Sequence, residues 1–189
     1  MTGLYNNIDN LQNRKDLTFL HRTPKFILGS LNLNRIAGTY KKIFHLTETA
    51  AQDMANLTGG YSFAFQVLGY FTWENDKKLN NEVLKKYDDY IAEYSYDKIY
   101  SELSPNEKKI VKIYGKFSSK AIKTADILKE SGFSSEIFNV YRQRLIRKGV
   151  VATAGYGYSR LVLPRFDIFL KNKSSYNNKL PDFTIIDEN

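Results

Sequence analysis

The sequence predicts a mainly α fold, in which a bundle of helices precedes a helix-turn-helix unit with a β-hairpin, the element order of a winged helix. Three observations predict this. Apolar residues recur at spacings of three and four between about residues 33 and 100. Serine, proline and glycine then mark the starts and stops of three further helices between residues 101 and 150. Two short β-rich runs follow, joined through a Gly-Tyr-Gly sequence.

The first 32 residues are polar apart from one short apolar run, Phe26-Ile27-Leu28. Pro24 disfavours a helical conformation at the residue before it, and Gly29 ends the run, so the run is predicted to be a short strand. It has no obvious strand partner nearby. We therefore expect it to pack on the helices that follow or to pair with another copy of the chain.

Residues 33–100 have a helical period. Leu46, Ala51 and Met54 share one face of a predicted helix, and Gly59 stands where a helix C-terminus favours a left-handed residue. The next helix, at about 62–74, is apolar almost all round, which predicts that its neighbours bury it. A third helix is predicted at about 77–99.

Residues 101–171 predict three helices and a hairpin. Ser104, Pro105 and Glu107 form a capping-box pattern that starts the first helix. The second helix spans about 121–130 and the third about 135–148, with glycines after each. The runs VVATAG and YSRLVLP, around Gly155-Tyr156-Gly157, predict the hairpin that would form the wing.

Composition excludes several classes of site. The 189 residues contain no cysteine and two distant histidines, so disulfides, thiolate zinc sites and a cysteine nucleophile are excluded. No apolar run is long enough to span a bilayer and the N-terminus is not a signal peptide, so a cytoplasmic protein without membrane contact is expected. No phosphate-binding Walker A loop occurs. The terminal FTIIDE resembles a Walker B strand, but without that loop it has no nucleotide to serve.

The positive charge is concentrated in one region. Residues 101–171 contain 14 Lys and Arg but 6 Asp and Glu, which accounts for the whole net charge of +8. At 100° per residue, one stripe of the third helix is predicted to face the protein core, and it consists of Ile137, Tyr141 and Leu145. The candidate DNA contacts lie elsewhere on that helix and on the wing: Asn139, Arg142, Gln143, Arg147, Lys148 and Arg160. The same unit also suits protein docking, and both partners stay open.

Four stretches in this order resemble the C-terminal half of a prokaryotic AAA+/STAND-type ATPase, of the branch related to archaeal origin-recognition initiators. They are FLHRTPKFILGSLNLNRIAGTYKKIF, LTGGYSFAFQVLGYFTWE, YDKIYSELSPNEKKIV and YRQRLIRKGVV…LVLPRFDIFL. The resemblance covers roughly residues 3–171. It implies a remnant of the AAA+ core at 1–32, a helical lid domain at 33–100, a winged-helix domain at 101–171 and a flexible tail at 172–189.

The resemblance also implies roles for particular residues. Arg22 falls where such proteins place an arginine finger, which approaches the γ-phosphate, often of a neighbouring subunit. The lid segment over the nucleotide would comprise Gly59, Gly60, Tyr61 and Ser62. Serine replaces the sensor arginine of origin-type relatives at position 62, which argues against direct phosphate sensing. ATP and magnesium are expected only with a full ATPase core, and this chain by itself is expected to bind no cofactor and to be no enzyme.

Three functions follow as expectations. The first is a lid and winged-helix fragment that couples the nucleotide state of an AAA+-like ATPase to DNA or protein binding. The second is a free-standing winged-helix DNA-binding regulator whose lid serves dimerisation. The third is a protein-docking adaptor. A homo-oligomer is compatible with all three.

Overall fold

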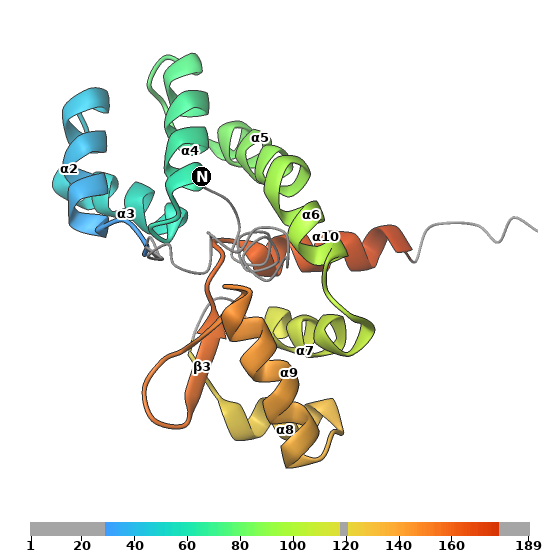
Figure 1. Cartoon of the computed structure of the whole chain (residues 1–189). Coiled ribbons are helices and arrows are strands. Elements are labelled where there is room, and N and C mark those ends of the chain that lie inside the picture. Colours follow the sequence, from blue (N-terminus) through green and yellow to red (C-terminus); the bar gives the residue numbers. More distant parts are fainter. Residues whose placement is uncertain (1–28, 118–120, 178–189) are drawn as a thin grey trace, which may run out of the picture.

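The computed structural model describes residues 29–117 and 121–177, which form a mainly helical protein with one small sheet (Figure 1). The Phe26-Ile27-Leu28 run lies outside the described residues. The first part consists of α2 (Leu33–Phe44), α3 (Glu48–Thr58), α4 (Ser62–Glu74), α5 (Asn81–Ile91), the π-helical turn η2 (Ala92–Tyr96) and α6 (Asp97–Ser101). The second consists of α7 (Pro105–Lys116), β1 (Ile122–Lys123), α8 (Thr124–Ser131), α9 (Ser135–Arg147), β2 (Val151–Thr153), β3 (Tyr158–Leu161) and α10 (Phe166–Asn177).

Local sequence sets the helix ends in the first part. The Asn32 side chain accepts hydrogen bonds from two first-turn amides of α2, and the Thr47 hydroxyl accepts one from the Ala50 amide of α3. Gly59 ends α3 in the left-handed conformation, which confirms the predicted stop. The helix predicted at 77–99 instead begins at Asn81, because Asp76 and Lys77 both adopt left-handed conformations. It continues through η2 and α6 as far as Ser101.

Buried tyrosines connect the helices of the bundle. The Tyr40 hydroxyl on α2 donates to the Phe65 carbonyl on α4 at 2.6 Å, and the Tyr87 hydroxyl on α5 donates to the Leu57 carbonyl on α3 at 3.0 Å. Burial raises the pKa of both phenols, so they stay protonated donors. Each ring therefore adds apolar burial and satisfies a carbonyl of a neighbouring helix.

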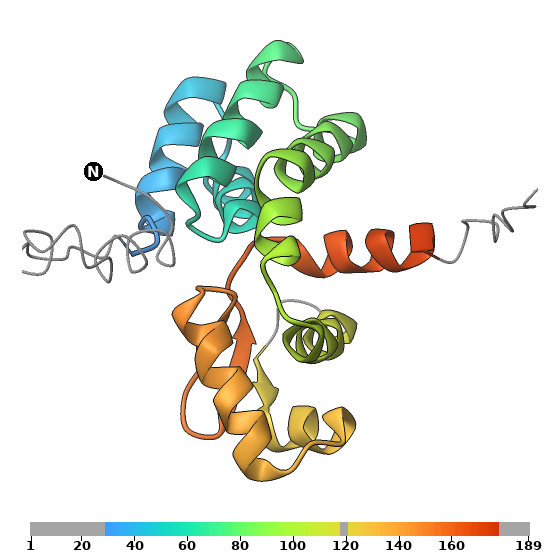
Figure 2. The ribbon, with the colours of Figure 1, turned by 45° about the vertical axis from the view of Figure 1, so that its right-hand side comes forward.

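The prediction that neighbours bury α4 all round is wrong for one side. Ala64, Val67 and Leu68 are fully or nearly fully buried, but Trp73 is 54% exposed and Tyr70 is also exposed. α2 and α5 lie on either side of α4 (Figure 2). The exposure of Tyr70 and Trp73 means that neither helix covers the strip that carries them. The sequence pattern did not reveal this strip, because aromatic residues occur at both the partly buried and the exposed positions of the helix.

The sheet has three antiparallel strands in the order β1-β3-β2. Ile122 pairs with Ser159, and Val151 pairs with Leu161. The predicted hairpin corresponds to β2 and β3. Strand β1 was not predicted, because two residues carry no period, and the helix expected from 121 begins at Thr124.

Helix α10 was also not predicted, and it extends into the tail expected from residue 172. Phe166, Phe169 and Leu170 on its first turns are buried, with Phe166 and Phe169 packed against Tyr96 of η2. The helix ends at Asn177, and the tail beyond it lies outside the described residues.

A second set of contacts joins the segment between β3 and α10 to the helical bundle. Arg165 donates two hydrogen bonds of 2.6 Å to the Asp88 carboxylate on α5. The Tyr96 hydroxyl donates to the Pro164 carbonyl at 2.6 Å. The segment between β3 and α10 is therefore fixed to the bundle at two points.

Candidate nucleic-acid interface

Helix α9 is the element on which the predicted DNA contacts depend. Ser134 caps its first turn by accepting from the Ile137 amide, and Phe138 and Leu145 are its fully buried side chains. Ile137 is 48% exposed, so its predicted core position is wrong. The buried stripe runs through Phe138, Tyr141 and Leu145 instead, which rotates the outward face of the helix relative to the prediction.

The rotation changes which polar side chains face outward. Asn139, Gln143 and Arg147 are exposed, as the sequence predicted. Arg144 is exposed as well, on the same side, with its guanidinium 5.5 Å from the centre of the Tyr141 ring. The prediction missed Arg144 because it started from Ile137; a stripe that started from Phe138 would have found it. Ile137 and Val140 complete the outward face with apolar surface.

Arg142 faces inward more than predicted. Its side chain is half-buried, and its Nε has no hydrogen-bond partner among the described residues. It lies beside Tyr114, whose hydroxyl is 2.6 Å from the Ser159 hydroxyl. Burial raises the pKa of Tyr114, and the contacts with Ser159 and Arg142 partly offset that rise. We therefore infer that Arg142 packs on the inner side of α9 and not on its outward face.

Lys148 is held by a structural ion pair. Its ammonium donates to Oε2 of Glu107 at 2.8 Å and to the Glu102 carbonyl at 3.1 Å. Glu107 is 1% exposed and also closes the capping box with Ser104 that was predicted for α7. The ammonium is already engaged, so Lys148 does not belong with the outward cations.

The tip of the hairpin lies beside the start of α8, since the Gly157 carbonyl accepts from the Thr124 amide at 2.8 Å. Gly155 and Gly157 both have left-handed backbone conformations, and Tyr156 between them is fully exposed. Arg160 lies on β3 with its side chain exposed, as predicted. Tyr156 was not among the predicted site residues, although its place between two glycines marks it as a loop tip.

The Gly-Gly turn is a packing joint in this structure. The Gly60 amide donates to Oγ1 of Thr58, and the Gly60 carbonyl accepts from the Leu31 amide at 2.8 Å. Gly59 faces Pro164, which would lie 3.3 Å from an added Cβ. The Tyr61 hydroxyl is 3.1 Å from that of Ser95. Of the four predicted lid residues, Gly59 and Ser62 are exposed, whereas Gly60 is buried. Because the Gly60 amide already donates to Thr58, it is not available to a phosphate.

The remaining predictions concern the arginine finger, metal binding and contact with a membrane. Arg22, the predicted arginine finger, lies outside the described residues. Within the described ranges no cluster of three or more His, Asp or Glu side chains is arranged to hold a metal ion. In the same part of the chain, no helix is both long and apolar enough to cross a membrane.

Residues 93–170 match the model of a family described as a domain of unknown function (DUF8462). This range begins within η2, includes the helices and strands from α6 to β3, and ends in α10. It covers less than half of the chain, so it shows similarity to that domain only. The comparisons with curated proteins and with solved structures give no match.

Proposed function

We propose that residues 105–161 form a winged helix and that this unit binds duplex DNA through the outward face of α9 and the hairpin. The observation that carries the proposal is the composition of that face: Asn139, Gln143, Arg144 and Arg147 are exposed together. Amide and guanidinium groups pair with adenine and guanine edges in the major groove. The order helix, strand, two helices and hairpin supports the winged-helix assignment.

The charges around this face favour a polyanion. Arg144, Arg147 and Arg160 form no ion pair with any other residue in the described ranges, whereas Lys148 does. Val140 adds apolar surface of the kind that contacts thymine methyl groups. Glu136, in the first turn of α9, is the one carboxylate of that helix, and carboxylates accept from cytosine amino groups.

The test is a fluorescence anisotropy titration of a mixed-sequence 24-base-pair duplex, repeated across a range of salt concentrations. Binding should weaken steeply with salt, because each neutralised phosphate contributes about 0.9 to the slope of log K against log salt. The double variant Arg144→Ala/Arg147→Ala should lower that slope by up to about 2 and weaken binding about tenfold or more.

Lys85→Ala is the matched control, because Lys85 is an exposed lysine on α5, away from the proposed interface. It should bind DNA as the wild type does. If the wild type does not bind at low salt, or if the double variant binds equally well, the outward face of α9 serves another partner. Its exposed Ile137 and Val140 would then point to a protein surface.

As a second candidate function, we propose that the helical bundle acts as a lid that passes the nucleotide state of an AAA+-like core to the winged helix. The observation in its favour is the joint between the two parts: the Asp88 pair with Arg165, the Tyr96 bond to Pro164, and Gly59 against Pro164. A lid can pass on a change of state only if it moves together with the unit that binds DNA. ATP and magnesium would enter only with a separate core.

Asp88→Ala tests whether this joint holds the two parts together. Both side chains of the pair are mostly buried, so losing the carboxylate leaves a mostly buried guanidinium unpaired and should cost about 2 kcal/mol. We expect the wild type to melt in one calorimetric transition and the variant to melt in two. Glu48→Ala, which breaks an exposed pair with Lys41, should keep a single transition. A single, barely shifted transition for Asp88→Ala would count against coupled motion.

A further inference from the structure

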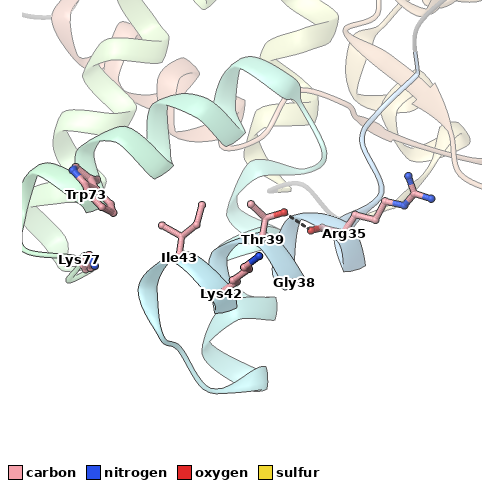
Figure 3. A pocket seen from close by; sticks show the side chains of 7 residues that line it. All are labelled: Arg35, Gly38, Thr39, Lys42, Ile43, Trp73 and Lys77. Atoms are coloured by element: carbon pink, nitrogen blue, oxygen red, sulfur yellow. Dashed lines mark hydrogen bonds between the residues drawn. The ribbon is translucent and has the colours of Figure 1, made fainter.

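An open groove of about 840 Å³ runs between α2 and the end of α4 (Figure 3). Ile43 and Trp73 face it from the two helices and are both largely exposed. An apolar hollow of about 270 Å³ adjoins it, where Phe65 and Tyr70 extend the same strip. The groove is thus part of a contiguous aromatic surface, and surfaces of this kind commonly mark binding sites.

The groove is also basic. Arg35, Lys42 and Lys77 line it, and within the described residues none of them makes an ion pair. Lys77 lies over Trp73, with its Nζ 4.8 Å from the centre of the ring. A ligand that fits must therefore bring apolar side chains for the floor and negative charge for the rim.

We propose that the groove binds the acidic, apolar C-terminal segment 182–189 of a second copy of this chain. That segment, DFTIIDEN, contains three carboxylates and no Lys or Arg, and it carries Phe183, Ile185 and Ile186 as apolar anchors. The N-terminal residues 1–28 also contain apolar side chains and are the other segment of the chain that the groove could bind. They carry four Lys and Arg against two Asp, so their charge has the same sign as the rim of the groove.

The position of α10 makes the donor a second copy. Figures 1 and 2 both show α10 leading away from α2, with α4 and α5 on the path between them. The 12 residues of α10 are about 18 Å long. The five steps from Asn177 to Asp182 span at most about 18 Å when fully extended. A chain that turned straight back would bring Asp182 only to the start of α10, which lies near Gly59 at the turn before α4, whereas Trp73 lies at the far end of that helix.

Such a contact is heterologous, since the tail of one copy meets the groove of the next. Each copy then keeps one free groove and one free tail, so association should continue beyond a dimer as the concentration rises. The winged-helix face is on the other part of the molecule and does not take part.

The first experiment measures the mass of the full chain by light scattering over a range of concentrations. The mass of the wild type should rise with concentration, and high salt should reduce the rise. Two charge-reversal variants should each weaken association at least tenfold: Arg35→Glu/Lys42→Glu in the groove and Asp187→Lys/Glu188→Lys in the tail. Mixing the two variants should give a heterodimer, because one keeps an intact tail and the other an intact groove. Lys85→Glu is the matched control and should associate like the wild type.

The second experiment uses Trp73, the single tryptophan of the chain, as a reporter in the groove. The tail variant Asp187→Lys/Glu188→Lys is titrated with a synthetic peptide of residues 180–189. The emission of Trp73 should shift to the blue, and a peptide with Asn, Asn and Gln in place of the three acids should bind at least tenfold more weakly.

Three results would overturn the proposal. One is a wild-type mass that does not change with concentration. Another is a failure of the two variants to form a heterodimer while each variant alone exposes Trp73 more than the monomeric wild type does, which would place the tail in the groove of its own copy. The third is a shift of Trp73 emission with a single-stranded oligonucleotide but not with the peptide. Circular dichroism of each variant checks that it is folded. Duplex binding through α9 is measured separately, so the two proposals succeed or fail independently.

Discussion

Replacing Gly60 by alanine is expected to destabilise the protein by about 2–4 kcal/mol. Gly60 has a backbone φ of +78°, which costs an alanine about 1–2 kcal/mol. An added Cβ would also lie 2.6 Å from the Leu31 carbonyl oxygen, which is backbone and cannot rotate away. Moving the backbone at Leu31 would break the hydrogen bond from the Leu31 amide to the Gly60 carbonyl. Urea unfolding followed by circular dichroism measures the loss.

Gly132 supplies the control for this prediction. It ends α8 with a φ of +68°, and an added Cβ would meet nothing within 4 Å. Gly132→Ala therefore isolates the conformational cost and should lose only about 1–2 kcal/mol. Equal losses at the two glycines would mean that the Leu31 segment yields readily, and that the Gly-Gly turn is not a tight joint.

The second large effect is expected at Glu107. Its carboxylate accepts from the Ser104 amide at 2.7 Å and from the Lys148 ammonium at 2.8 Å while almost fully buried. Glu107→Ala leaves Lys148 without its ion-pair partner and the Ser104 amide without its acceptor, at a cost of about 2–4 kcal/mol. Glu82→Ala is the matched control, because Glu82 lies in the first turn of α5 and pairs with Lys86 in full solvent. That variant should show no clear loss in the same denaturation experiment.

The same carboxylate predicts a dependence on pH. Burial alone would raise the pKa of Glu107, but the hydrogen bonds from Lys148 and Ser104 outweigh burial, so its pKa in the folded protein lies below the ordinary value. A carboxylate with a lowered folded pKa stabilises the protein above its unfolded pKa of about 4.3, and that stability is lost as the pH falls through the folded pKa. The gap in unfolding free energy between wild type and Glu107→Gln should therefore be constant at neutral pH and shrink in acid. A gap that is independent of pH would show that the ion pair contributes little.

The proposed DNA interface depends indirectly on this pair. Lys148 follows α9 directly, and its ammonium ties the end of that helix to the start of α7. A recognition helix reads bases only if it is held at a fixed angle to its neighbours. Glu107 and Lys148 thus support the outward face of α9 without touching a ligand.

The sequence by itself determined the local features of this protein. The capping box at Ser104, the left-handed glycines at positions 59 and 132, and the hairpin after residue 150 were all predicted and are all present. Each depends on hydrogen bonds or backbone angles within a few residues, so neighbours in the sequence are enough to specify it.

Only the tertiary structure decided which side chains are available for function. The sequence placed Lys148 among the outward cations, but its ion pair reaches 41 residues back to Glu107. It placed Ile137 in the core, but the helix period leaves the choice between adjacent stripes to the packing of α7 and α8 against α9, which buries Phe138 instead. The exposed strip at Trp73 likewise follows from where α2 and α5 pack on α4. Hydropathy measures how much apolar surface a helix has, whereas its neighbours determine how much of that surface is covered.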